Sequence, residues 1–133
     1  MSVGNNVMSL LVCILSCLPE NLKGQITLYV DHRQLDLVLR EMMVADVFPE
    51  WFSSAFYYDP LHGFLGGLRD ALSLAVFCEL VEYGGTDFDY HIKIGPRIRK
   101  LLLERISVPE ASVAVWAKDL EDRLLALERF AAS

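Results

Sequence analysis

The segment from Asp59 to Tyr83, DPLHGFLGGLRDALSLAVFCELVEY, constrains the fold of this 133-residue chain more than any other. Asp59 is a favourable N-cap, Pro60 suits the first helical position, and the glycines that follow Tyr83 are a typical helix stop. The middle of the segment carries no charge, and its apolar residues occupy nearly every face, which is typical of a helix buried in a protein core or in a membrane. Because the uncharged run is far shorter than the ~20 residues of a membrane span, the pattern predicts a buried central helix over about residues 60–83.

Three glycines stand in the first part of this predicted helix: Gly63, Gly66 and Gly67. Each costs about 1 kcal/mol relative to alanine in a helix interior. Two explanations stay open from the sequence. Either another backbone approaches closely at these positions, or the helix begins near Gly67.

Two segments have the composition of β-strands. Residues 25–30, QITLYV, are rich in β-branched and aromatic side chains. In residues 87–94, DFDYHIKI, apolar and polar residues alternate strictly, which predicts a half-buried strand. Two strands make a minimal sheet that is stable only when it lies on helices. Their separation along the chain excludes a β-hairpin between them.

Capping residues and apolar periodicity predict helices over most of the remaining chain. These helices are expected over residues 7–18, from Asp31 to about Asp46, over 49–58, over 96–106, and from Ser107 toward the C-terminus. The chain is therefore expected to form one domain over residues 1–133 of the α+β class. It is predominantly helical, with five to six helices around the buried central helix and a small two-stranded sheet.

The same periodicity predicts which helical side chains face the solvent. In the helix that begins at Asp31, the outward-facing side chains are expected to be Asp36, Arg40 and Glu41. In the helix over 96–106, the expected outward-facing side chains are Arg97, Arg99 and Lys100, and the expected inward-facing ones are Ile98, Leu101 and Leu102.

Residues 7–18, VMSLLVCILSCL, allow two interpretations. The segment resembles the apolar core of a signal peptide, but the six residues before it hold no lysine or arginine, which such a signal normally has. A buried helix is the favoured interpretation, and a processed signal remains the alternative. The three cysteines, Cys13, Cys17 and Cys78, all lie in apolar surroundings, which indicates reduced thiols in a cytoplasmic protein.

The formal net charge of −6 argues against general nucleic-acid binding, which needs a basic face. The charge is uneven, because residues 93–109 carry five basic side chains and one acidic side chain. An acidic body attracts a basic partner and speeds their encounter. Ordinary solubility explains the same charge.

Aromatic residues are densest between residues 49 and 58, in numbers that exceed the need of one side of a short helix. Large rings are over-represented at the centres of protein interfaces. Either both faces of this segment are buried in the core, or part of the set is presented to a partner. The second interpretation predicts a protein-binding surface in which rings anchor a partner and carboxylates supply charge. The candidate partner-binding residues are Trp51, Tyr57, Tyr58, Asp59, Glu79, Glu82, Asp87, Asp89 and Tyr90. The concrete form of this hypothesis is a cytoplasmic inhibitor or immunity-type protein that neutralises a basic partner such as a nuclease toxin, without a cofactor, a metal or a membrane.

Two alternatives accompany this interpretation. Asp87, Asp89 and His91 alternate along one strand, so their side chains project to one side, about 6.5–7 Å apart. With His62 they suggest a divalent-metal site or an acid–base centre, although the chain contains no recognised catalytic motif. The other alternative is a helical homodimer that pairs through the last helix or the aromatic stretch.

Overall fold

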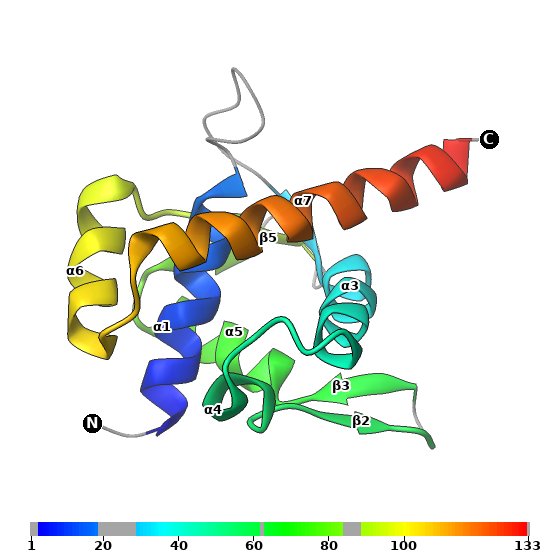
Figure 1. The fold of residues 1–133 in the computed structure, drawn as a ribbon, viewed down its shortest axis with the longest axis horizontal. Helices are drawn as coiled ribbons and strands as arrows, with labels where there is room; N and C mark the ends of the chain where they lie inside the picture. Colours follow the sequence, from blue (N-terminus) through cyan, green and yellow to red (C-terminus); the bar gives the residue numbers. More distant parts are fainter. Residues whose placement is uncertain (1–2, 19–28, 62, 84–88, 133) are drawn as a thin grey trace.

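The computed structural model describes residues 3–18, 29–61, 63–83 and 89–132, and these form six helices and five short strands (Figure 1). In chain order the elements are α1 (Val3–Ser16), β1 (Tyr29–Asp31), α3 (His32–Val44), α4 (Glu50–Ser53), β2 (Tyr57–Asp59), β3 (Phe64–Gly66), α5 (Leu68–Phe77), β4 (Val81–Tyr83), β5 (Asp89–Ile92), α6 (Pro96–Ile106) and α7 (Glu110–Ala132). The expected class, predominantly helical α+β, is confirmed.

Helix α1 is the buried centre of the fold. Every residue from Val7 to Leu18 is buried, including two serines. Helices α5, α6 and α7 pack around it, and α7 crosses its face (Figure 1). The Ser16 hydroxyl donates to the carbonyl of Cys13 at 2.7 Å, so the buried polar atom is satisfied within the helix. The interpretation of residues 7–18 as a buried helix thus agrees with the fold. No helix in the described part of the chain is long and apolar enough to cross a membrane.

The prediction of a central helix over residues 60–83 is wrong in its extent and in its role. Helix α5 covers only Leu68–Phe77, and the flanking residues form strands β3 and β4. One face of α5 packs on α1, but Phe77 is 86% exposed. The helix that is apolar on all sides is α1, because residues 1–19 contain no charged side chain, whereas α5 carries Arg69 and Asp70 in its first turn.

Both explanations of the glycines hold. Gly67 is the N-cap of α5 with φ of +93°, a region that a side chain disfavours, so the helix does begin there. A Cβ on Gly67 would also lie 2.6 Å from the carbonyl oxygen of Ala55, so another backbone approaches closely. At Gly66 the ring of Tyr57 occupies the position of the missing side chain. The two glycines are therefore fixed by tertiary contacts.

Three helices end in the same way, with a left-handed residue that is not glycine. At the end of α5 the residue is Glu79, with φ of +64°, and the N–H of Leu80 then donates to the carbonyl of Ala75 at 2.9 Å. This is the Schellman arrangement, in which an apolar residue after the left-handed position packs back on the helix. The three left-handed residues, after α3, α5 and α6, are Asp46, Glu79 and Ser107.

The main sheet has three antiparallel strands in the order β1-β5-β4. Tyr29 pairs with His91, and Val81 pairs with Ile92. The expected pairing of the strands near 25–30 and 87–94 is therefore present in their described parts, whereas residues 25–28, 87 and 88 lie outside the described residues. The third strand, β4, comes from the segment that was predicted to be helical. A separate two-stranded sheet, β2-β3, replaces the end of the helix predicted over 49–58.

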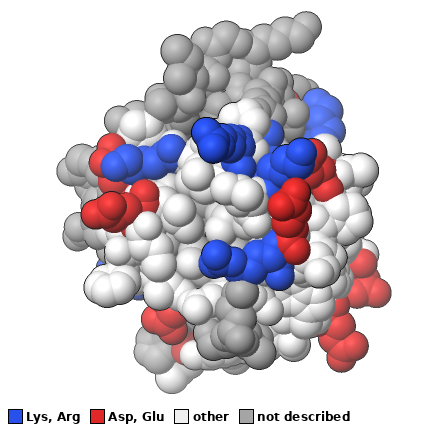
Figure 2. Space-filling model, turned by 90° about the vertical axis from the view of Figure 1, so that its left-hand side faces the viewer, with Lys and Arg blue, Asp and Glu red and all other residues white. Residues whose placement is uncertain are grey.

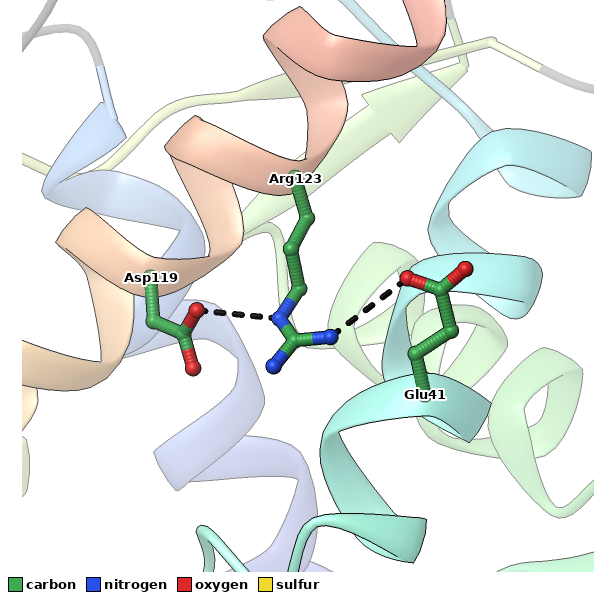
Figure 3. A network of polar contacts seen from close by, with 3 residues as sticks. All are labelled: Glu41, Asp119 and Arg123. Atoms are coloured by element: carbon green, nitrogen blue, oxygen red, sulfur yellow. Dashed lines mark hydrogen bonds and ion pairs between the residues drawn. The ribbon is translucent and has the colours of Figure 1, made fainter.

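Helices α3 and α7 are joined by one arginine (Figure 3). Arg123 on α7 donates from Nε to Asp119 Oδ1 at 2.9 Å and from Nη1 to Glu41 Oε2 on α3 at 3.5 Å. The hydrogen bond to Asp119 is the main reason that the pKa of Arg123 is raised. Partly exposed ion pairs of this kind contribute about 0–1 kcal/mol, so the network orients Glu41 more than it stabilises the fold.

Candidate functional site

The β2–β3 hairpin presents apolar side chains on both of its faces. Tyr58 is paired with Leu65, so these two side chains lie on the same face of the hairpin. Tyr57 and Phe64 lie on the opposite face, where they are 66% and 45% exposed. Leu61, in the turn between the strands, is 85% exposed. The hairpin is therefore an exposed apolar and aromatic projection that packs on the body through α3 (Figure 1).

An open groove of about 730 Å³ lies between α3 and the hairpin. Its lining is mainly apolar, and its principal residues are Leu37, Arg40, Val44, Phe56, Tyr58 and Leu65. Phe56 and Leu65 are buried and form the base, whereas Val44 on the rim is 89% exposed. Contiguous exposed apolar surface of this kind marks interaction sites in soluble proteins.

A buried carboxylate connects α3 to the hairpin behind two residues that line the groove, Arg40 and Leu65. Asp36 is buried, and its Oδ2 accepts a hydrogen bond from the Leu65 N–H at 2.7 Å. Its Oδ1 lies 2.9 Å from Nε of Arg40, one turn further along α3. The guanidinium carbon of Arg40 is 4.8 Å from the centre of the Tyr58 ring, which is cation–π geometry. Arg40 is thus held by a carboxylate and by an aromatic face.

Three of the predicted partner-binding residues are adjacent on β2: Tyr57, Tyr58 and Asp59. The Asp59 carboxylate accepts the N–H of Leu61 at 2.9 Å, so it stabilises the turn of the hairpin and does not cap a helix. Trp51 lies on the short helix α4, partly exposed, with its ring edge-on to Phe52. Two of the four predicted aromatic residues, Tyr57 and Tyr58, thus lie on the hairpin.

The other predicted residues lie elsewhere. Tyr90 is 2% exposed and belongs to the core, which corrects the expectation that it anchors a partner. Glu79 caps α5, and Glu82 lies on β4. Asp89 pairs in register with Asp31, and nothing further is described of its side chain. Asp87 lies outside the described residues.

His91 pairs with a carboxylate on the neighbouring strand β4. Its Nδ1 lies 3.0 Å from Oε1 of Glu82 on the neighbouring strand, and Lys93 lies 3.7 Å from the other oxygen of that carboxylate. Across residues 3–18, 29–61, 63–83 and 89–132, no group of three or more histidine, cysteine, aspartate or glutamate side chains is placed to hold a metal ion. His62 lies outside these ranges.

Asp36, Arg40 and Phe64 are not among the residues that the sequence predicts for a binding surface. Asp36 and Arg40 were expected to face solvent because both are charged and lie on the polar side of the helical pattern. Their spacing of four residues, acid before base, is a recognisable helical ion-pair signal. Nothing local indicates that Asp36 is buried, because the hairpin that covers it comes from a distant part of the chain.

The basic residues of 93–109 gather on a second surface. Figure 2 shows lysine and arginine side chains on the face that α6 presents, where Arg97, Lys100 and Arg105 are exposed. Arg99 points inward, contrary to expectation, and its Nη1 donates to the Ser16 hydroxyl on α1 at 3.3 Å. Leu101 is exposed, so the true inner face of α6 is rotated from the predicted one.

The chain was compared with known protein families, curated proteins and solved structures. No family model, curated protein or solved structure matches this chain.

Proposed function

We propose that this chain is a non-enzymatic protein-binding domain whose partner contacts the β2–β3 hairpin and the groove beside it. The observation that carries the proposal is the exposure of Tyr57, Leu61 and Phe64 on one short hairpin. Rings of this size bury a large apolar area at a small cost in conformational entropy, which is why they dominate interface energetics. A hairpin braced by α3 holds these rings in place before a partner arrives.

The finer form of the proposal is an inhibitor that covers a basic surface of an enzyme such as a nuclease toxin. The net charge of −6 supports it, as do exposed carboxylates that include Glu50, near the hairpin in sequence, and Glu79 and Glu82 on the far side of α5. Electrostatic complementarity speeds the encounter, and buried aromatic contacts slow the release.

The experiment is a capture of partners from the native host with matched variants. Phe64→Ser removes a ring that is 45% exposed on the hairpin, and the control Phe77→Ser removes a ring that is 86% exposed at the end of α5. The proposal expects a partner that is retained by the wild type and by Phe77→Ser but lost with Phe64→Ser. For the inhibitor form, retention also weakens steeply as salt is raised. A partner that binds all three proteins equally contradicts the assignment of the surface.

One observation favours an enzyme as the second candidate. Glu82 orients the imidazole of His91 from a neighbouring strand, which is the arrangement of a carboxylate-supported general base. The test is His91→Ala: this candidate requires that a hydrolytic or isomerase activity of the wild type disappears while the thermal unfolding profile is unchanged. A homodimer remains a further alternative, which light scattering at high concentration decides.

A further inference from the structure

Among the described residues that line the groove, Arg40 is the one cation. Arg40 pairs through Nε with the buried Asp36 and stacks on Tyr58. In the part of the chain that the structure describes, its two terminal nitrogens make no hydrogen bond or ion pair. These nitrogens form one edge of a planar fork that matches a carboxylate bidentately.

Arg40 is also positioned in advance. The carboxylate of Asp36 is fixed by the Leu65 N–H, and the ring of Tyr58 limits rotation of the guanidinium about its stem. A side chain that is already ordered loses less entropy when it binds a ligand. The neighbouring acid, Glu41, does not compete for Arg40, because its carboxylate contacts Arg123 on α7 (Figure 3).

The groove is open, and apart from Glu41 and Ser53 the rest of its lining is apolar. Leu37, Val44 and Tyr58 are exposed along its rim, and the volume of about 730 Å³ accepts several aliphatic side chains. A small molecule requires a site that covers most of its surface, which this open groove does not provide. A protein segment suits it better, because the segment's own chain covers the rim residues.

We propose that the groove binds a segment of a protein partner in which an aspartate or glutamate is flanked by aliphatic or aromatic side chains. The carboxylate accepts two hydrogen bonds from the terminal nitrogens of Arg40, and the apolar neighbours pack on Leu37, Val44 and Leu65. The inference rests on the proposed function, since it names the chemistry of the partner at the groove, on the hairpin face opposite Tyr57 and Phe64. It adds a local acidic determinant to a partner whose wider surface is expected to be basic.

The test selects displayed random 12-residue peptides on the wild-type protein and maps the enriched peptides on the groove by the amide shifts of Val44 and Leu65. Enriched peptides are expected to contain an acidic residue beside Leu, Ile or Phe. Replacing that residue by its amide in the synthetic peptide is expected to weaken binding by about tenfold or more. This change leaves the fold of the protein untouched.

Protein variants complete the test. Arg40→Gln risks unfolding, because it leaves Asp36 buried without its counter-ion. Arg40→Lys keeps the charge and loses the planar fork. It is expected to weaken the binding of peptides that carry the acidic residue and to leave the binding of their amide versions unchanged. Lys100→Gln, which removes an exposed charge from α6, is the matched control and is expected to change nothing.

Two results overturn the inference. One is a set of groove-binding peptides whose affinity stays the same when the acidic residue is replaced by its amide. The other is the absence of any enriched peptide that changes the amide chemical shifts of Val44 and Leu65. Neither result removes the proposed function, which depends on Phe64 and a host partner. Conversely, a host partner that binds Phe64→Ser as well as it binds the wild type contradicts the proposed function, even if acidic peptides bind the groove.

Discussion

Replacing Glu79 by glycine is expected to stabilise the protein, although it removes a charged surface residue. Glu79 has φ of +64° at the end of α5, a conformation that costs roughly 1–2 kcal/mol for a residue with a Cβ. Glycine removes this cost but adds backbone freedom to the unfolded chain, which offsets about 0.4–1 kcal/mol. The free energy of unfolding is therefore expected to rise by about 0.5–1 kcal/mol, or roughly 2–4 °C in Tm for a chain of this length.

Urea titration of the wild type, Glu79→Gly and Glu79→Ala measures this effect. The alanine variant removes the same charge but keeps the Cβ, so it is expected to gain nothing. Equal stabilisation by alanine and glycine would refute the reasoning, because the gain would then come from charge and not from the backbone. The same pair of substitutions at Ser107, with φ of +58°, provides an independent repeat.

Three further predictions concern a buried carboxylate, two glycines with positive φ and a buried thiol. Asp36→Ala leaves the Leu65 N–H and Arg40 without their partner and is expected to cost about 3–5 kcal/mol in urea titration, whereas a loss below 1 kcal/mol would show that the bridge is dispensable. Gly67→Ala is expected to cost about 2–5 kcal/mol, because the Cβ meets a carbonyl oxygen, whereas Gly63→Ala, with φ of +70° and open space, costs about 1–2 kcal/mol. Burial raises the pKa of Cys13 from 9.0 to about 12, so the unfolded chain ionises this thiol first and stability falls as pH rises above 9; Cys13→Ala is expected to flatten that part of the profile.

The sequence by itself determined the helical elements whose signals are local. Capping residues and apolar periodicity located α3, α6 and α7 to within a few residues, and strict alternation located β5. The exposed rings on β2 were also among the residues proposed from composition alone, because a surplus of rings in a short segment is visible without a structure. What these features share is that neighbours in the chain decide them.

Only the tertiary structure decided which helix is central and where the site lies. A side chain at Gly67 would meet the carbonyl oxygen of Ala55, and one at Gly66 would meet the ring of Tyr57. The periodicity of the sequence reveals neither contact. Asp36 is buried because a hairpin nearly thirty residues further along the chain donates its Leu65 N–H to it. Burial depends on contacts between distant segments, and those contacts place a helical ion pair beside a candidate binding groove.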